Sequence, residues 1–181
     1  MMRICVYCGS RTSKNTHFSE AANELGKKIA QRNWGIVYGG GKIGMMGLVA
    51  DSALAHNGEV IGIIPTALKT KEVAHYGVSR LIETPDMHSR KAKMEKLSNA
   101  FLVLPGGFGT LDEFFEILTW RQLGFHQKPI IVVNIDGYFD GLAQFVHRAI
   151  EEEYIRASNQ ELFTWTQSIE ESLEQLDLEF S

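Results

Sequence analysis

The stretch that decides the fold runs from Ala100 to Trp120 and reads AFLVLPGGFGTLDEFFEILTW. Its first part, Phe101–Leu104, is an apolar run of strand length that stops at the Pro-Gly-Gly of residues 105–107. Apolar residues then recur at positions 111, 114, 115 and 118, which is the spacing of a helix. A strand, a glycine-rich turn and a helix in this order aim backbone N–H groups and the positive end of the helix dipole at one point. The stretch therefore predicts a phosphate site, which a ligand can approach closely at Gly106, Gly107 and Gly109.

Thr110 and Glu113, at the start of this helix, allow two interpretations. Their Thr-x-x-Glu spacing is that of a capping box, in which the two side chains satisfy backbone N–H groups and contribute about 1 kcal/mol. The alternative is that Glu113 is a functional carboxylate held beside the phosphate site. Asp112, Glu113 and Glu116 place negative charge where an anion is expected, although acidic residues at helix N-termini are ordinary. The spacing alone leaves both interpretations open.

Length and composition fit one soluble globular domain, residues 1–181. Hydrophobic residues make up 44% of the chain and charged residues 22%. The net charge of −4 argues against a general nucleic-acid-binding role, which favours a basic surface. No apolar run approaches the ~20 residues of a membrane span, and the N-terminus lacks the pattern of a signal peptide. We therefore expect a cytoplasmic protein whose partners include neither a membrane nor a nucleic acid.

The two cysteines, Cys5 and Cys8, form a C-x-x-C pair. Redox chemistry or metal binding is one interpretation of this spacing. However, Cys5 lies in a predicted strand, where a three-residue spacing places side chains on opposite faces. The sequence has no second cysteine pair to complete a zinc site. We therefore expect two reduced thiols in and just after a buried strand, and we expect neither a metal nor another cofactor.

Strands alternate with helices along the rest of the chain. We expect the further strands at residues 4–7, 35–38, 60–64, 79–83, 130–134 and 162–165. The further helices are expected at 16–32, 45–56, 87–99, 139–154 and 168–176, and a loop with one helical turn at 66–78. The strands are apolar throughout, which is typical of a parallel sheet covered on both faces. The expected fold class is therefore α/β, a Rossmann-like doubly wound domain with a mostly parallel sheet of about six or seven strands.

Glycine-rich turns follow three of the predicted strands, at Gly9, at 39–41 and at 106–109. Because ligands of such folds bind at the carboxyl ends of the strands, the turns are expected to converge on one crevice. Residues 39–44 also match the dinucleotide fingerprint Gly-x-Gly-x-x-Gly, but a lone match is weak. The acidic residue about 20 positions on is Glu59, which precedes a strand and so lies at the wrong edge of the sheet. We favour a tight turn with close helix packing at Gly44 and Gly47 over NAD or FAD binding.

The run from Asp86 to Met94, DMHSRKAKM, is the second informative stretch. Arg90, Lys91 and Lys93 lie near the start of a predicted helix, where the dipole disfavours cations. One interpretation is a solvated face, which is the usual place for Lys93. The other is that Arg90 or Lys91 points into the crevice, at an anion or a base. The sequence does not decide between these interpretations, and His88 is expected to be structural.

Three motifs together resemble those of the LOG ("Lonely Guy") family. They are PGGFGTLDE at Pro105–Glu113, DMHSRK at Asp86–Lys91 and GGGKIGMMG at Gly39–Gly47. The resemblance covers residues 3–155, and the combination of PGGxGTxxE with an upstream Arg-Lys pair is highly specific. It implies a Rossmann-like homodimer that hydrolyses the N-glycosidic bond of adenosine 5′-monophosphate (AMP) or of its N6-modified forms, such as cytokinin riboside 5′-monophosphates. The products of that reaction are free base and ribose 5-phosphate.

The resemblance also assigns roles to individual residues. It implies that Arg90 and Glu113 are catalytic and that the turn from Gly106 to Thr110 holds the 5′-phosphate. The substrate-binding residues that it implies are Gly41, Met87, Arg90, Lys91, Gly106, Gly107, Phe108, Gly109, Thr110 and Thr119. Residues 66–83 depart from the family pattern, so a contact from this segment to the sugar or base is not carried over.

Two alternatives belong to other classes of protein. Members of this family have often been called lysine decarboxylases, but that reaction needs pyridoxal phosphate on a lysine. None of the lysines here lies in a context that singles out a Schiff base. The other alternative is a nucleotide-sensing or nucleotide-carrying module of the same fold. Release of free base from an AMP-like small molecule separates the enzyme from the sensor, and the sequence leaves the physiological monophosphate open.

Overall fold

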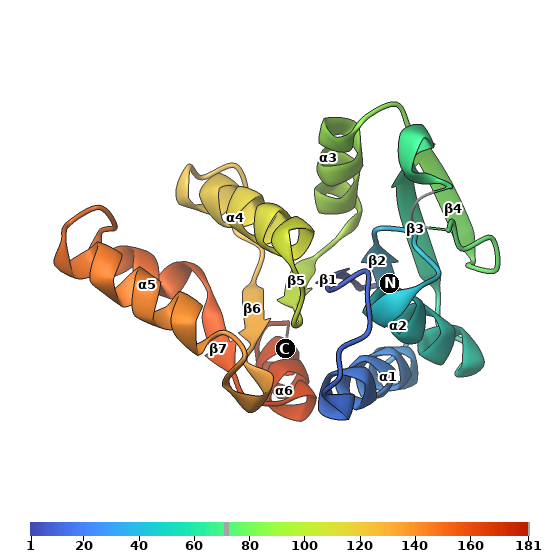
Figure 1. Ribbon diagram of the computed structural model, residues 1–181, viewed down its shortest axis with the longest axis horizontal. Helices are drawn as coiled ribbons and strands as arrows, with labels where there is room; N and C mark the ends of the chain where they lie inside the picture. The colour runs from blue at the N-terminus through green and yellow to red at the C-terminus, as the bar shows by residue number, and fades with distance from the viewer. Residues whose placement is uncertain (71–72, 181) are drawn as a thin grey trace.

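A parallel sheet runs through the middle of the molecule (Figure 1). The computed structural model describes residues 1–70 and 73–180, and their sheet has seven strands in the order β4-β3-β2-β1-β5-β6-β7. Every pair of neighbouring strands is parallel. The strands are β1 (Arg3–Tyr7), β2 (Gly35–Tyr38), β3 (Val60–Pro65), β4 (Arg80–Thr84), β5 (Ala100–Val103), β6 (Ile130–Val133) and β7 (Thr164–Thr166). The predicted α/β class and doubly wound arrangement are confirmed.

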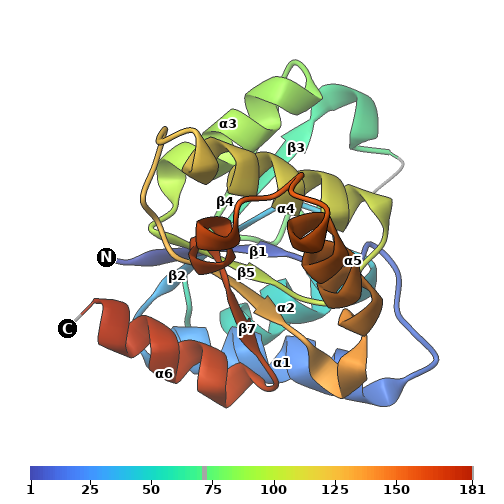
Figure 2. The same cartoon turned by 90° about the vertical axis from the view of Figure 1, so that its left-hand side faces the viewer.

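Helices cover both faces of this sheet (Figure 1 and Figure 2). One face carries α1 (Thr16–Gln31), α2 (Gly44–Ala55) and α6 (Ile169–Glu179), and the other carries α3 (Met87–Leu97), α4 (Phe108–Gln122) and α5 (Asp140–Glu151). Short 3-10 helices are η1 (Thr66–Leu68), η2 (Ile135–Gly137) and η3 (Ala157–Leu162). Side chains of β1 alternate between two buried clusters, with Ile4 and Val6 in one and Cys5 and Tyr7 in the other. Within the described residues, no helix combines the length and the apolar character needed to cross a bilayer.

The predicted elements are present, and the main differences lie at their ends. The difference that matters for the site concerns α4, which begins at Phe108 rather than near residue 111. It begins there because Gly107 has extended dihedrals (φ −100°, ψ −151°) and serves as the N-cap. The predicted loop at 66–78 contains the expected helical turn, η1, and residues 71–72 of this loop lie outside the described residues.

The strand order reverses between β1 and β5, and this reversal positions the site. From β1 the chain continues to α1 on one face, and from β5 it continues to α4 on the other. A crevice therefore forms between the two loops at the carboxyl edge of the sheet. The loops touch, since the Gly9 N–H donates to Pro105 O at 3.1 Å. A Cβ added to Gly9 would lie only 3.5 Å from the Cα of Gly106.

Helices α1 and α2 pack closely against each other beneath this crevice. Their closest approach is at Gly26 of α1, which is buried. A Cβ added there would lie 2.3 Å from Val49 O and 2.9 Å from Ala53 N, both backbone atoms of α2. Any larger residue would force the two helices apart.

We expect Gly26→Ala to lower the free energy of unfolding by about 1–3 kcal/mol, because overpacking at this contact shifts backbone. Urea unfolding followed by circular dichroism measures the change. Gly141→Ala in α5 is the matched control, since its added Cβ would meet nothing within 4 Å. It should be neutral or slightly stabilising. Equal losses in both variants would contradict the close packing of α1 and α2.

Candidate active site

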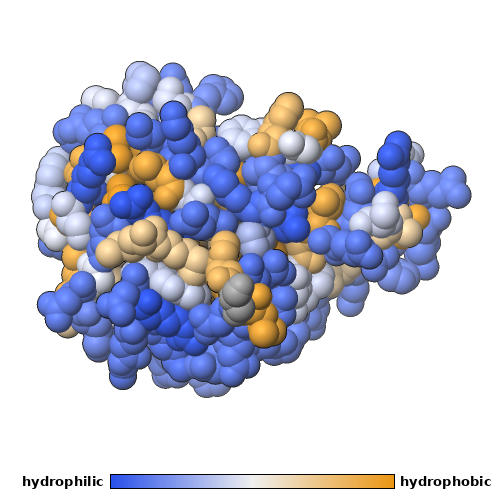
Figure 3. Space-filling model, turned by 180° about the vertical axis from the view of Figure 1, so that it is seen from behind, coloured by the Kyte–Doolittle hydropathy of each residue, from blue (hydrophilic) through white to orange (hydrophobic). Residues whose placement is uncertain are grey.

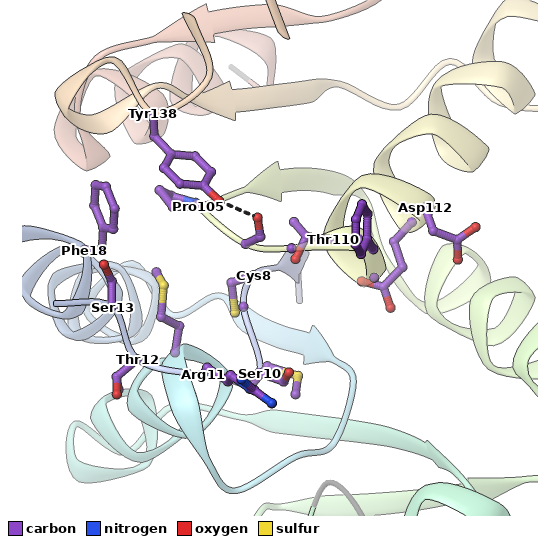
Figure 4. A pocket seen from close by; sticks show the side chains of 18 of the residues that line it. Cys8, Ser10, Arg11, Thr12, Ser13, Phe18, Pro105, Thr110, Asp112 and Tyr138 are labelled. Carbon is purple, nitrogen blue, oxygen red and sulfur yellow. Dashed lines mark hydrogen bonds between the residues drawn. The ribbon is translucent and has the colours of Figure 1, made fainter. Parts of the chain in front are cut away.

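A cavity of about 550 Å³ opens at the crevice between β1 and β5 (Figure 4). One wall is the loop after β1, residues 8–13, and the facing wall is the turn after β5 with the start of α4. Figure 4 shows these two walls, with Ser10, Arg11 and Thr12 on one side and Pro105 and Thr110 on the other. The remaining lining residues are Phe18, Met45, Met46, Met87, Arg90 and Tyr138.

The turn after β5 has the features of an anion site at a helix N-terminus. Because Gly107 is the N-cap of α4, the N–H groups of residues 108–110 precede the first hydrogen bond of the helix, which runs from the Leu111 N–H to Gly107 O. A Cβ added to Gly107 or Gly109 would meet nothing within 4 Å, so a ligand has room to reach this backbone. The helix dipole adds positive potential at the same place.

The capping-box interpretation of Thr110 and Glu113 is wrong. Since α4 begins at Phe108, Thr110 is the third helical residue and Glu113 the sixth, so neither occupies the cap. Thr110 is buried, and its hydroxyl lies against Gly106, where an added Cβ would be 2.0 Å from Oγ1. Glu113 is therefore not required for the start of the helix.

Arg90 and Glu113 form a buried ion pair that joins α3 to α4. Arg90 Nη2 lies 3.7 Å from Glu113 Oε1, and the side chains are 4% and 11% exposed. The other terminal nitrogen of Arg90, Nη1, lies 3.8 Å from the sulfur of Met87. Asp86 fixes the start of α3 by accepting a hydrogen bond from the Ser89 N–H at 2.7 Å. Charges interact more strongly in such a site than in water, because protein replaces the screening solvent.

The glycine-rich run after β2 makes room for Arg90. A Cβ added to Gly39 would lie 2.0 Å from Arg90 Nη2, so any other residue would displace the guanidinium. Gly44 and Gly47 pack against backbone, where an added Cβ would lie 2.3 Å and 1.9 Å from the nearest atoms. The fingerprint at residues 39–44 thus serves close packing, as favoured above, and its first glycine also forms a wall behind the arginine.

The side chain of Lys91 extends from α3 towards α4. Lys91 is not among the described residues that line the cavity. Its ammonium group is 3.1 Å from Asp112 Oδ2 and 3.1 Å from Glu116 Oε2. Burial alone would lower the pKa of Lys91, but the hydrogen bonds to Glu116 and Asp112 outweigh it and raise the pKa. Lys91 therefore stays charged, and its ion pairs hold α3 against α4 where Arg90 meets Glu113.

The structure brings most of the residues implied by the family resemblance together. Those that line the cavity are Met87, Arg90, Gly106, Gly107, Phe108, Gly109, Thr110 and Glu113. Gly41, Lys91 and Thr119 lie elsewhere. Gly41 pairs with Ala74 in an isolated bridge. Thr119 is exposed further along α4 and donates its hydroxyl proton to Phe115 O at 2.7 Å.

Several residues that line the cavity were not identified from the sequence. Arg11 brings a second cation to the cavity, from a polar loop that directly follows a buried strand. That position, at the carboxyl end of a strand, is the signal that could have identified it. Phe18 and Tyr138 meet edge to face, with ring centroids 5.4 Å apart and planes at 80°. No local pattern could find this contact, because the two residues lie far apart in the sequence.

Known proteins resemble this chain over most of its length. The family described as "Possible lysine decarboxylase" matches residues 46–176. Cytokinin riboside 5′-monophosphate phosphoribohydrolase LOG3 of Arabidopsis thaliana is 43% identical over 175 residues, which are 97% of this chain and 81% of that protein. LOG1 of the same plant is 41% identical over 175 residues, with 97% and 82% covered. The solved molybdenum cofactor binding protein of Rippkaea orientalis has a TM-score of 0.75 at 22% identity, covering 99% of this chain and 98% of that one, which shows the shared fold alone.

Fold and cavity together define a Rossmann-like α/β protein with the open N-terminus of a helix beside a buried arginine–glutamate pair. The chain belongs to the LOG family, whose relatives named above are phosphoribohydrolases.

Both cysteines are free thiols, and Cys8 lines the cavity. Cys5 is inaccessible in β1, and Cys8 is also buried. Burial raises the pKa of both thiols above the ordinary value, because it disfavours the charged thiolate. Since the thiolate is the reactive form, this environment does not suit redox or metal chemistry at the C-x-x-C pair.

We expect neither cysteine to react with iodoacetamide at mildly alkaline pH while the protein is folded, and both to react after unfolding in guanidinium chloride. Mass spectrometry counts the modified thiols. Rapid alkylation of Cys8 in the folded protein would show a thiolate in the cavity and contradict this expectation.

Proposed function

We propose that this protein hydrolyses the N-glycosidic bond of a purine nucleoside 5′-monophosphate, which is AMP or an N6-modified AMP such as a cytokinin riboside 5′-monophosphate. The products are free base and ribose 5-phosphate. The observation that carries the proposal is that the buried Arg90–Glu113 pair and the open N-terminus of α4 line the same cavity. The names of the Arabidopsis relatives support it.

The 5′-phosphate binds at residues 106–110 in this proposal. A phosphate there accepts hydrogen bonds from the N–H groups of the first turn of α4 and is favoured by the helix dipole. Thr110 and Glu113 are three residues apart, so they are neighbours on one helix face, with about 5–6 Å between Cβ atoms. A phosphate beside Thr110 therefore places the ribose of the nucleotide next to the Glu113 carboxylate.

The chemistry of the reaction matches the side chains of Glu113 and Arg90. The bond from the ribose C1′ to the base breaks, its electron pair leaves with the base, and C1′ gains positive charge. Glu113 stabilises this charge and orients the water that adds to C1′, and the proton lost by the water balances the one gained by the base. Arg90 does not act as a base, because a guanidinium stays protonated. It holds the nucleotide or donates to the departing base.

The decarboxylase alternative finds no support in the cavity. It needs a lysine that can form a Schiff base, and none is among the described residues that line the cavity. Lys91, the neighbour of Arg90 in the sequence, is held by Asp112 and Glu116. The sensor alternative uses the same binding site but leaves the glycosidic bond intact.

Gly41, Lys91 and Thr119 are further substrate-binding residues in this proposal, on the family resemblance alone. The described ion pairs of Lys91 hold α3 and α4 together beside the Arg90–Glu113 pair, which is a structural role. Gly41 and Thr119 are not among the described residues that line the cavity.

We also propose that residues 1–181 form one domain that works as a homodimer in the cytoplasm. The free, buried thiols fit a reducing compartment. On the face shown in Figure 3, hydrophobic residues form separate patches among mostly hydrophilic ones. Phe108 and Phe125, at the two ends of the α4 region, are 94% and 73% exposed, and we infer that a second copy of the chain covers such apolar side chains. Light scattering should therefore give twice the chain mass of 20.3 kDa. A mass of one chain would contradict the dimer.

Chromatography of the reaction products tests the proposed function. The protein is incubated separately with AMP, N6-isopentenyl-AMP and other nucleoside monophosphates, and the free base and ribose 5-phosphate are quantified. Equal amounts of both products are expected from at least one purine monophosphate. Binding without base release would favour the sensor alternative, and release of carbon dioxide from lysine would support the decarboxylase alternative.

Glu113→Gln should lower kcat by about 10²–10³-fold, the usual cost of losing one preorganised electrostatic group. The amide keeps the size and hydrogen-bonding reach of the carboxylate but leaves Arg90 without its anionic partner, so the variant should melt at a lower temperature yet still fold and bind AMP. The melting temperature, the Kd for AMP and the rate of base release are measured together. Glu20→Gln, on the exposed side of α1, is the matched control and should keep full activity. An active Glu113→Gln would remove the support for a catalytic carboxylate.

Gly107→Val should raise the KM for AMP about tenfold or more, which corresponds to losing one charged hydrogen bond. The backbone of Gly107 has a negative φ and open space around its Cβ position, so the valine fits the fold and occupies the ligand space. Gly141→Val is the matched control, since its Cβ position is also open but lies in α5.

Adenosine offers a second test of the phosphate position, because it lacks the phosphate and should be a far poorer substrate than AMP. Similar kcat/KM values for adenosine and AMP, or an unchanged KM in Gly107→Val, would contradict the placement of the phosphate at this turn.

A further inference from the structure

Tyr138, between η2 and α5, lines the cavity but has no role in the reaction described above. Its hydroxyl donates a hydrogen bond to Gly106 O at 2.7 Å (Figure 4). We propose that Tyr138 is a positioning residue for the phosphate: by holding the Gly106 carbonyl, it fixes the direction of the Gly107 N–H. The inference rests on the proposed function, because it assumes that residues 106–110 bind the 5′-phosphate.

The geometry of the peptide group links these two atoms. A trans peptide points its C=O and its N–H to opposite sides of one plane. The described residues contain no cis peptide bond, so the Gly106 carbonyl and the Gly107 N–H are opposed. With the carbonyl bonded to Tyr138, the Gly107 N–H is held on the side away from the tyrosine, where it can donate to a phosphate oxygen.

This peptide needs a restraint of its own. It lies between two glycines, which have a wide range of accessible dihedrals. The Gly9 N–H donates to Pro105 O and the Leu111 N–H donates to Gly107 O, each at 3.1 Å. These two hydrogen bonds hold the two ends of the turn. The Tyr138 hydroxyl acts between these two anchors, on the carbonyl of Gly106 itself. It therefore restricts the rotation that would turn the Gly107 N–H away from the ligand.

Tyr138 is itself held firmly by contacts that cross the crevice. Its ring packs edge to face on Phe18 of α1. Asp136, two residues earlier, accepts a hydrogen bond from Asn15 Nδ2 at 2.8 Å and pairs with the ring of His17 at 2.9 Å. The start of α1 thus fixes the turn that carries Tyr138, which is the support that a preorganised site requires.

The hydroxyl acts through the backbone rather than on the ligand. A tyrosine hydroxyl has one proton to donate, and here Gly106 O receives it. Its effect should therefore appear in the affinity for phosphate and not in the chemical step.

Tyr138→Phe tests this role, because it removes the hydroxyl and keeps the ring on Phe18. Calorimetric titration with inorganic phosphate should give a Kd about fivefold higher than that of the wild type, the loss of one neutral hydrogen bond. The KM for AMP should rise by a similar factor, while kcat, the melting temperature and the Kd for adenosine stay unchanged. Tyr154→Phe is the matched control, since Tyr154 is 89% exposed and outside the cavity lining.

An unchanged phosphate Kd in Tyr138→Phe would overturn the inference, whether or not AMP is hydrolysed. Equal losses for phosphate and adenosine would also overturn it, because they would indicate a packing role. Weaker phosphate binding without any base release in the wild type would support the positioning role and refute the proposed function. A wild-type protein that binds no phosphate would overturn the inference, while base release from AMP decides the proposed function separately.

Discussion

The protein keeps one arginine almost entirely out of water, and the cavity is arranged around it. Arg90 is 4% exposed, and a buried charge is costly without an anionic partner. Glu113 provides that partner from α4, and Gly39, after β2, leaves the space that the guanidinium fills. The end of β2 and the starts of α3 and α4 must therefore meet at one point. The parallel sheet makes this possible, because the carboxyl ends of all its strands lie on one edge.

The same kind of pairing explains how the proposed anion site could lie beside several carboxylates. Asp112 and Glu116 are bound to Lys91, and Glu113 faces Arg90. The negative charges on α4 are thus balanced within the protein, so the N–H groups at the start of the helix remain available to a phosphate. In the proposed reaction the carboxylate of Glu113 lies next to the sugar, where positive charge develops during cleavage.

Much of the fold could be predicted, because buried strands such as β6 are apolar throughout and helical stripes separate them. The start of α4 could not, since Gly109 and Thr110 carry no hydrophobic signal and the extended backbone at Gly107 sets the boundary. The roles proposed for Arg90 and Glu113 came from the family resemblance, and local spacing left a capping box equally open. The bond from Tyr138 to Gly106 spans 32 residues and depends on the order of the strands, which local patterns do not encode.

A crystal structure of the Glu113→Gln variant with bound AMP tests the central claim most directly. It should show the phosphate against the backbone N–H groups of residues 107–110, with the ribose C1′ beside the side chain at position 113 and the base close to Arg90. A phosphate bound at the opposite wall, near Arg11, or a base seated in the glycine turn would contradict the claim that phosphate binding at α4 brings the glycosidic bond to Glu113.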